Sequence, residues 1–559
     1  MGFGPSFCHW VQLFYCGVSS AVNVNGFISD FFPLSRGVRQ GCPLSPLLYV
    51  LVVEVLACNI RADPNISGIC LPGSTTSLPV ISAYADDTSL VLGSDQDIVA
   101  CLEVYKRYEH GSGAKLNLSK CKGLWLGAWN GRSDSPVPIT WSFVKIKVLG
   151  VFLGPGNLEE SNWRPRIEAV EHVLNSWRQR SLSFKGKALV VNALALARVW
   201  YVASLIHVPE WVVAEINKLI FKFFWSGKRD LVARKVVVQP FCNGGFGMVD
   251  VRSKISALHV QWVRRYVTSP SSWSVLFSYC FLDRFGASPL TVLSTPSIFS
   301  SRRLPPFYAA LLDAWCSCGG HFSSSSLGVG SGIAFQPVST FSARSVYRLL
   351  LSDLESTPHC FWKFLPSFGP LYWPVTWRQL FFFNIDRPVI DLCWKIAHGV
   401  VYTAERLISF GLDVPAPCFC GHQLESLEHL FFSCPLAESV WFWVQSLMYL
   451  VSPACPHLLS RHVLFGFSSD ELRVVPRLFV YLINVGKFFL WLSRNDFRFR
   501  SIRPSAVEVI ESVKSRVRFY LPVFGAKFLS SRRRRLFTRQ WGARGMFASF
   551  AGNKVVVTL

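Results

Sequence analysis

Two adjacent carboxylates, Asp86 and Asp87, occupy the middle of an otherwise apolar segment, AYADDTSLVL at 83–92. Residues 80–84 and 88–92 are rich in strand-forming side chains, which predicts a largely buried strand pair with the acidic residues at the turn between them. Two neighbouring anions repel each other, so one of them resists ionisation unless a cation lies close by. The pair therefore indicates either a solvated turn, where aspartate is common, or a site for a divalent cation.

A second candidate site lies in CFCGHQLESLEHLFFSC at 418–434. Three cysteines and a histidine are spaced there as a tetrahedral zinc set, namely Cys418, Cys420, His429 and Cys434. Four protein ligands leave no open position on the metal, so such a zinc would be structural. Two alternatives stay open: the four side chains are simply buried, or His422 competes as a ligand.

The segment RGVRQGCPLSPLLY at 36–49 reads as a glycine-bounded loop followed by a helix over 47–59, which we expect to be mostly buried. Glycine lets the backbone approach a ligand closely, so this loop is a candidate binding segment. Farther along, helical periodicity covers 162–266 and resumes near residue 345. The serine-rich residues 269–344 between them are predicted to be an irregular linker or variable region.

The chain has 559 residues, with 57 Lys and Arg against 34 Asp and Glu, and a net charge of +23. This excess predicts a polyanionic partner, of which nucleic acid is the commonest and an anionic membrane the main competitor. Charges interrupt every apolar segment before the ~18 uncharged residues that a membrane span needs, so no membrane is expected. The 17 cysteines fit a reducing compartment, which predicts a nuclear or cytoplasmic protein that is not secreted.

The last region, 498–559, is predicted to be a basic tail that contains four consecutive arginines: Arg532, Arg533, Arg534 and Arg535. Such a run is either a solvated charge cluster, a nuclear import signal or a contact with a polyanion through counterion release. Aromatic residues interleave with the basic ones, which favours nucleic-acid binding.

Taken together, RGVRQGCPLSPLLY and the YADD that follows it resemble the fingers and palm of reverse transcriptases, specifically those of non-LTR (LINE-type) retrotransposons. Further segments follow in the family's order: GAKLNLSK at 113–120, VLGVFLG at 148–154, SWRQRSLSFKGKALVVNAL at 176–194 and GGFGMVDV at 244–251. Each motif alone is weak, but the whole set in register is specific. The Cys418 segment, flanked by WKIAHG at 394–399 and WLSRND at 491–496, resembles the zinc-binding domain of the same family.

The resemblance implies an α+β fold. Residues 1–155 would form a truncated fingers and palm region with an antiparallel sheet and helices, and 156–268 a helical thumb and connection. Residues 345–497 would form a mostly helical region with a small zinc-binding module. The implied activity is RNA-directed DNA polymerisation, with Mg²⁺ or Mn²⁺, an RNA template, a DNA primer and deoxynucleotides.

The resemblance also implies a role for individual residues. Asp86 would be a direct metal ligand, Asp87 a weaker one, and Lys120 a charge partner of the departing pyrophosphate. The pocket for the nascent base pair would include Arg39, Gln40, Gly41, Tyr84 and Ala85. Leu149 and Gly150 would contact the primer in a hairpin.

One family feature is missing. The family places a further aspartate, in an F-x-D-x-x-x-A-F-D type segment, before the loop at Gly37, whereas residues 1–36 contain only Asp30, after an Asn-Gly turn. The segment MGFGPSFCHW at 1–10 resembles a stretch that the family carries after that aspartate. We therefore expect Met1 to be internal to a longer element and the chain as written to be an impaired polymerase. A noncatalytic nucleic-acid-binding remnant is the alternative, and a peripheral membrane protein is a third.

Overall fold

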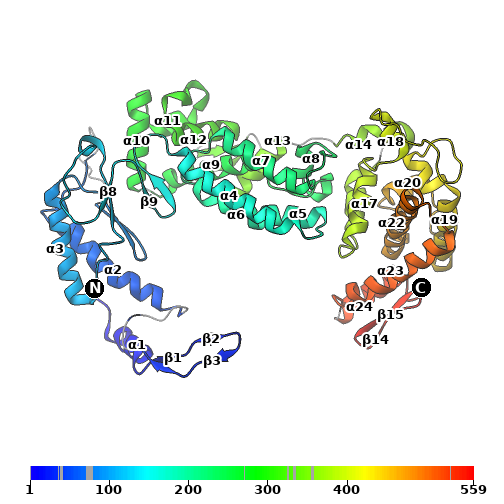
Figure 1. The fold of residues 1–559 in the computed structure, drawn as a ribbon, viewed down its shortest axis with the longest axis horizontal. Helices are drawn as coiled ribbons and strands as arrows, with labels where there is room; N and C mark the ends of the chain where they lie inside the picture. Colours follow the sequence, from blue (N-terminus) through cyan, green and yellow to red (C-terminus); the bar gives the residue numbers. More distant parts are fainter. Residues whose placement is uncertain are drawn as a thin grey trace. The chain divides into compact units, whose positions relative to one another are not determined.

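The computed structural model describes residues 2–34, 37, 42–70, 80–269, 271–323, 326–330, 335–353, 358–369, 371–528 and 530–559. The chain forms two compact units (Figure 1). The first comprises Met1–Leu158 with Ser272–Leu276, and the second comprises Glu159–Ser271 with Phe277–Leu559.

The first unit combines helices with short two-stranded sheets. Its helices are α1 (Pro5–Tyr15), α2 (Ser45–Ala62) and α3 (Asp95–Ser112). Its antiparallel strand pairs are β1 (Ser19–Ser20) with β4 (Phe32–Pro33), β2 (Asn23–Val24) with β3 (Phe27–Ile28), β5 (Ile81–Tyr84) with β6 (Asp87–Leu90), and β9 (Ile146–Val148) with β10 (Val151–Leu153). The parallel pair is β7 (Lys122–Leu124) with β8 (Thr140–Ser142).

Two of these hairpins turn through residues in the left-handed region of backbone conformation. Asn25 and Gly26 have φ of 51° and 90°, and Leu149 and Gly150 have φ of 46° and 85°. Two successive positive φ angles match the turn that suits the right-handed twist of paired strands. The turn expected at the Asn-Gly pair and the hairpin expected at 148–154 are therefore confirmed.

The core of the first unit joins α2, α3 and the β5–β6 hairpin through eight buried side chains: Leu56, Ala57, Ile60, Ile66, Ile81, Ala100, Cys101 and Val104. The expectation that α2 is mostly buried is wrong. Its other face exposes Leu47, Val50, Val52 and Val55, and α1 buries none of its residues. A mostly apolar run of this kind does not show from the sequence how many faces of the helix are covered by other elements.

Among the described helices, α2 is also long and apolar enough to cross a membrane, as judged by length and composition only. It qualifies although it carries Glu54 and Arg61, which form an ion pair at 2.7 Å. A bent segment of the second unit, residues 184–203, qualifies as well if it is taken as one span. Helices of soluble proteins share these properties, so the observation is weak evidence for a membrane.

The second unit is almost entirely helical. Its first half contains α4 (Glu159–Arg178), α5 (Phe184–Val190), a π-helical turn η2 (Val191–Ala195), α6 (Ala197–Ala203), α7 (Glu210–Phe224), α8 (Arg234–Val238) and α9 (Val251–Thr268). These helices confirm the helical periodicity predicted over 162–266.

The predicted linker at 269–344 is instead largely folded. It contains α10 (Ser272–Phe285), α11 (Pro289–Ser294), α12 (Pro306–Ser317) and a small antiparallel sheet of β11 (His321–Ser323), β12 (Ser326–Val329) and β13 (Gln336–Pro337). Helix α12 and the following α13 (Ala343–Asp353) pack on α9. Buried apolar residues such as Phe277, Leu311 and Trp315 recur between the serines, and they decide the structure of this region.

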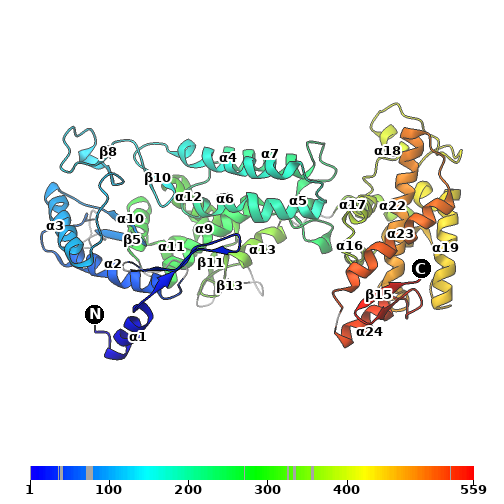
Figure 2. The same ribbon diagram turned by 60° about the horizontal axis from the view of Figure 1, so that its bottom comes forward.

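The second half of this unit is a helical assembly. Its elements are α14 (Cys360–Lys363), α15 (Leu365–Phe368), α16 (Trp373–Leu380), α17 (Arg387–Ala397), α18 (Ala404–Ser409), the π-helical turn η7 (His429–Ser433), α19 (Pro435–Val451), α20 (Ser460–Phe465), α21 (Glu471–Val474) and α22 (Arg477–Arg500). The predicted basic tail is also folded, as α23 (Ala506–Gly525), α24 (Ser531–Gln540), β14 (Ala548–Ala551) and β15 (Lys554–Val557). Helices α19, α22 and α23 lie side by side, and the β14–β15 hairpin packs on α23 and α24 (Figure 2).

Two motifs that are distant in the sequence meet in the second unit. Trp394 Nε1 donates a hydrogen bond to the carbonyl oxygen of Gly244 at 2.7 Å, and His398 Nε2 lies 2.9 Å from the same oxygen. A Cβ added to Gly244 would lie 2.8 Å from the Trp377 ring, so only glycine fits there. GGFG at 244–247 and WKIAHG at 394–399 thus form the joint between the two halves of this unit.

Candidate functional site

The acidic pair lies at the end of the β5–β6 hairpin. Tyr84 pairs with Asp87, so Ala85 and Asp86 form the two-residue turn, and Ala85 has a φ of 53°. The predicted hairpin is present, but Asp87 is the first residue of β6 and not part of the turn. Burial is also less than predicted, because Ile81 is the only fully buried residue of the two strands and Tyr84 is 72% exposed. Both carboxylates are exposed and accessible to a cation or substrate.

The helices behind the hairpin hold its base. The backbone amide of Val91 donates to the carbonyl of Val80 at 2.8 Å, which extends the ladder by one pair. Burial raises the pKa of Tyr105 on α3, while a hydrogen bond with Thr88, next to Asp87, acts in the opposite direction. The hairpin is therefore anchored through one face and open at its tip.

Tyr49, the last residue of the loop and helix motif at 36–49, lies near the acidic tip. Burial raises its pKa, and the negative charge of Asp86 raises it further. Coulombic influence falls with distance, so α2 brings the end of this motif close to Asp86. The predicted pocket residues Arg39, Gln40 and Gly41 lie outside the described residues, and their placement stays a prediction.

The other predicted polymerase residues lie on separate turns. Lys120 is exposed in the turn before β7, where its backbone amide donates to the carbonyl of Asn117. Among the described residues, no hydrogen bond or ion pair joins Lys120 to Asp86 or Asp87. Leu149 and Gly150 form the tip of the β9–β10 hairpin, and their contact with the primer stays a prediction.

Sequence reasoning missed one buried carboxylate in this unit, that of Asp97. Its oxygens accept backbone hydrogen bonds from Ser67, Gly93 and Ser94 at 2.9–3.0 Å, and Ser94 caps α3 in return. Burial alone would raise the pKa of Asp97, but these hydrogen bonds outweigh it and lower the pKa. The signal was the capping-box spacing Ser94-x-x-Asp97, which marks the start of the helix behind the hairpin.

The four predicted zinc ligands come together in the second unit. Their ligand atoms all lie within 4.8 Å of one another, and this is the one such His, Cys, Asp and Glu group of three or more in the described part of the chain. Cys418 Sγ lies 4.0 Å from Cys434 Sγ, and Cys420 Sγ lies 3.2 Å from His429 Nε2. Ligands about 2.0–2.3 Å from a tetrahedral zinc are separated by roughly 3.5–3.8 Å, so both the donor set and its spacing fit zinc.

Two local turns present these ligands. In the first, the Cys418 amide donates to the His422 carbonyl at 2.9 Å, and Gly421 adopts a φ of 93°. In the second, the π-helical turn η7 begins at His429, and the Cys434 amide donates back to the His429 carbonyl at 2.8 Å. Burial lowers the pKa of His429, which favours the neutral ring that a metal requires.

His422, the alternative ligand, is outside the cluster. Its ring stacks on His429 with a centroid separation of 4.0 Å, and its Nδ1 lies 3.1 Å from the carbonyl oxygen of Leu424. In this arrangement the His422 ring packs against one face of the His429 ring and helps to orient it. The four-residue set is therefore complete without it.

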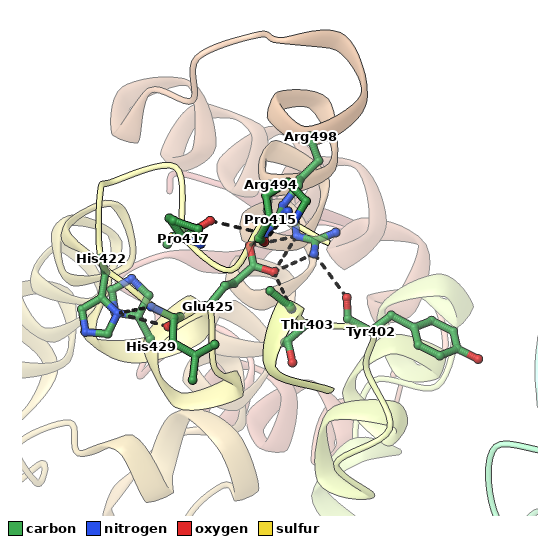
Figure 3. A network of polar contacts seen from close by, with 12 residues as sticks. Tyr402, Thr403, Pro415, Pro417, His422, Glu425, His429, Arg494 and Arg498 are labelled. Carbon is green, nitrogen blue, oxygen red and sulfur yellow. Dashed lines mark hydrogen bonds and ion pairs between the residues drawn. The ribbon is translucent and has the colours of Figure 1, made fainter. Parts of the chain in front are cut away.

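A buried ion pair lies next to the loop that carries the zinc ligands (Figure 3). Glu425, 0% exposed, accepts hydrogen bonds from Arg494 of α22 at 2.6 and 3.1 Å and from the Ala404 amide at 3.1 Å. Arg498 donates to the carbonyl of Pro415 at 2.9 Å and lies 3.6 Å from Glu425. Figure 3 shows these side chains converging beside His422 and His429, so Arg494 of the WLSRND motif ties the metal-binding loop to α22.

Comparison with known proteins agrees with this geometry. Residues 2–153 match the family model of the reverse transcriptase (RNA-dependent DNA polymerase), and residues 341–441 match that of zinc-binding in reverse transcriptase. The chain is 31% identical over 324 residues to a Transposon TX1 uncharacterized 149 kDa protein of Xenopus laevis, an alignment that covers 56% of this chain and 24% of that protein.

Two further relatives come from insects. A Retrovirus-related Pol polyprotein from the type-2 retrotransposable element R2DM of Drosophila melanogaster is 32% identical over 120 residues, covering 22% of this chain and 11% of that protein. One from the type-1 retrotransposable element R2 of Popillia japonica is 25% identical over 250 residues, covering 42% and 40%. The chain spans less than half the length of each of these relatives. The chain therefore contains a reverse transcriptase domain and a domain of the kind that binds zinc in reverse transcriptases, and its relatives are retrotransposon proteins, which is consistent with a reverse transcriptase of a non-LTR (LINE-type) retrotransposon.

Proposed function

We propose that the protein copies RNA into DNA at the β5–β6 hairpin, with Asp86 and Asp87 as ligands of magnesium. The supporting observation is the placement of two hard oxygen donors on an exposed, anchored tip close to the helix that carries Tyr49. Carboxylate oxygens are the ligands that magnesium prefers. When bound, the metal would neutralise charge on the attacking hydroxyl and the triphosphate.

The chain's own residues would orient the substrates. The Asp86 and Asp87 carboxylates would fix where the triphosphate lies, while exposed Tyr84 and Ala85 line the same tip beside the nascent base pair. Lys120 would offer a positive charge to pyrophosphate, and the Leu149–Gly150 tip would touch the primer end. These roles follow the family's order of motifs, with the RNA template and DNA primer as partners.

We propose further that this activity is weak. In the described residues, no third carboxylate joins Asp86 and Asp87 in a metal-binding group. Asp30, the only acidic residue among 1–36, is exposed between β3 and β4. A site for two metal ions needs more anionic ligands than one hairpin tip supplies.

The zinc-binding module would act as a structural element, with Cys418, Cys420, His429 and Cys434 as ligands. Four protein ligands close the coordination sphere, so no step of the reaction is assigned to this metal. Its contribution would be to fix the loop beside α22.

Primer extension tests the proposal. Purified protein, a DNA primer annealed to an RNA template, deoxynucleotides and Mg²⁺ should give slow extension. Asp86→Ala should abolish it, whereas Asp30→Ala should leave it unchanged.

Salt-sensitive binding of the primer–template without extension, in the wild type as in Asp86→Ala, would contradict the proposal. The absence of a third carboxylate near the tip, among the residues that the structure describes, favours this second candidate, a noncatalytic nucleic-acid-binding remnant. The two functions are separated by whether binding is accompanied by Mg²⁺-dependent synthesis.

A further inference from the structure

A groove at the end of the second unit is lined by four arginines. It lies between α24 and the β14–β15 hairpin, is open to solvent, and has a volume of about 450 Å³. Its lining residues are Arg534, Arg535, Thr538, Arg539, Arg544, Ser549 and Phe550. Only two members of the four-arginine run, Arg534 and Arg535, belong to it, whereas Arg539 and Arg544 were not singled out from the sequence.

Helix α24 has two different faces. Side chains three or four residues apart share a helix face, so Arg535 and Arg539 line the groove together with Arg534 and Thr538. Phe537, on the opposite side, is fully buried, and its ring lies 5.2 Å from that of Phe550 and 5.5 Å from that of Phe528. The helix is therefore held in one orientation, with its guanidinium groups toward the groove.

The other wall is equally constrained. A Cβ added to Gly542 would lie 2.0 Å from the carbonyl oxygen of Ala548, so the loop before β14 packs directly on the strand. Within this loop, Ala543 and Arg544 have φ of 47° and 64°. Left-handed backbone is unfavourable for residues other than glycine. The turn that adopts it here places Arg544 at the groove. Arg534 donates to the Gly552 carbonyl at 3.0 Å, which fixes the hairpin tip.

The charge of this region is unbalanced. Residues 512–559 contain no Asp or Glu, and no carboxylate lines the groove. Four guanidinium groups around one shallow space repel each other, and an anion placed between them removes that repulsion. Planar guanidinium groups bind phosphate oxygens through paired hydrogen bonds, so phosphate is the anion that this groove fits best.

The groove fits a chain of phosphates better than an isolated base. It is open to solvent, and Arg535 and Arg539 are exposed. The Phe550 ring is already covered by the Arg534 guanidinium, 5.2 Å from its centroid, so a nucleobase has no free aromatic face to stack on. We propose that the arginine groove binds the phosphodiester backbone of single-stranded RNA without reading its bases. This deepens the proposed function by naming a contact for its nucleic-acid partner, and it does not require catalysis.

Charge reversal in the full-length protein tests the proposal. Fluorescence anisotropy would measure binding of a labelled 20-nucleotide RNA over a series of salt concentrations. Arg539→Glu and Arg535→Glu should each weaken binding by about tenfold near physiological salt, and the slope of log affinity against log salt should fall by about 0.7 for each phosphate that is no longer neutralised. Arg535→Lys, which keeps the charge, should lose less than threefold.

Arg533→Glu is the matched control, because it makes the same charge change on the same helix. Arg533 is two positions from Arg535, about 200° around the helix, and does not line the groove. It should leave RNA affinity within threefold. Equal losses from Arg533→Glu and Arg539→Glu would overturn the proposal, as would unchanged RNA affinity in Arg539→Glu. Loss of binding to phosphatidylserine vesicles in Arg539→Glu, with RNA binding unchanged, would also overturn it in favour of a membrane surface.

The same assay separates this proposal from the polymerase assignment. Asp86→Ala should retain RNA affinity even though extension is lost. Failure of extension in every variant, with Arg539→Glu still weakening RNA binding, would reject the catalytic proposal and support the groove.

Discussion

The two metal-binding candidates of this chain are built in opposite ways. Asp86 and Asp87 stand on an exposed hairpin tip whose base alone is anchored, whereas the cysteine and histidine set is assembled within 4.8 Å and largely buried. A catalytic metal needs open positions for substrate, while a structural metal is surrounded by protein ligands. The contrast indicates that the zinc-binding region stabilises the fold, whereas the hairpin tip keeps its carboxylates accessible to a metal ion and a substrate. Substitutions on the two sides of this contrast should therefore differ in their effect on stability.

The largest effect is expected at a zinc ligand. Cys434→Ser removes one of four ligands, and structural zinc sites contribute roughly 10–16 kcal/mol of apparent binding free energy. We expect loss of zinc by elemental analysis and loss of helicity by circular dichroism. Cys455→Ser, which alters a buried cysteine outside the cluster, should retain zinc. Full zinc content in Cys434→Ser would show that the ligand set is wrong.

A smaller effect is expected at the buried ion pair. Glu425→Gln leaves Arg494 buried with its charge uncompensated, and breaking such pairs costs about 3–5 kcal/mol. Urea unfolding should show this loss, while Glu438→Gln, at an exposed position, should stay within about 0.5 kcal/mol. If the two variants were equally stable, the ion pair would not support the zinc-binding loop.

The pH dependence of stability is a third difference. Burial lowers the pKa of His398 to about 4, while an unfolded histidine has a pKa near 6.5. Between these values the unfolded state binds one more proton than the folded state, so this histidine's contribution is full above pH 6.5 and is lost as the pH falls toward 4. The loss amounts to about 1.4 kcal/mol per pH unit.

The readout is the difference between the wild type and His398→Gln. Burial raises the pKa of Asp391 to about 7, which acts in the opposite sense over the same range and is common to both proteins. Urea midpoints from pH 6.5 to 5 should therefore fall more steeply in the wild type than in His398→Gln. His110→Gln, at an exposed position, should follow the wild type. Parallel curves for all three proteins would contradict the buried, neutral state of His398.

The smallest effect on stability is expected at the hairpin tip. Asp86→Ala removes an exposed carboxylate and its repulsion with Asp87. In thermal unfolding without divalent metal, the free energy of unfolding should therefore be unchanged or slightly raised, by no more than about 0.5 kcal/mol. A loss above about 2 kcal/mol would show that Asp86 is a structural residue and would weaken the comparison.

Local patterns predicted the local structures well. The Asn25-Gly26 hairpin was predictable because two-residue turns have strong sequence preferences, and the YADD hairpin because strand-forming residues flank it on both sides. The zinc ligands were predictable because the spacing of the cysteines and the histidine places them on two local turns whose side chains can bind one metal ion. Prediction failed where long-range packing decides. The serines of 269–344 obscured the helices that bury Trp315, and the basic composition of 498–559 obscured the core around Phe537.

Contacts between distant segments were also invisible in the sequence. Gly244 and Trp394 are 150 positions apart, and Glu425 and Arg494 are 69 apart. Motif resemblance had marked all four of these segments without giving a structural reason for their contacts. Their hydrogen bonds now provide one, because the motifs that flank the zinc ligands are the residues that hold the surrounding helices together.

Manganese binding followed by electron paramagnetic resonance is the sharpest test of the metal site at the hairpin tip. With RNA template, DNA primer and a non-hydrolysable deoxynucleotide analogue, the wild type should convert free Mn²⁺ into a protein-bound signal. The Asp86→Ala, Asp87→Ala double variant should lose that signal while keeping its zinc. Equal Mn²⁺ binding by both proteins would contradict the assignment of the hairpin tip as the metal site.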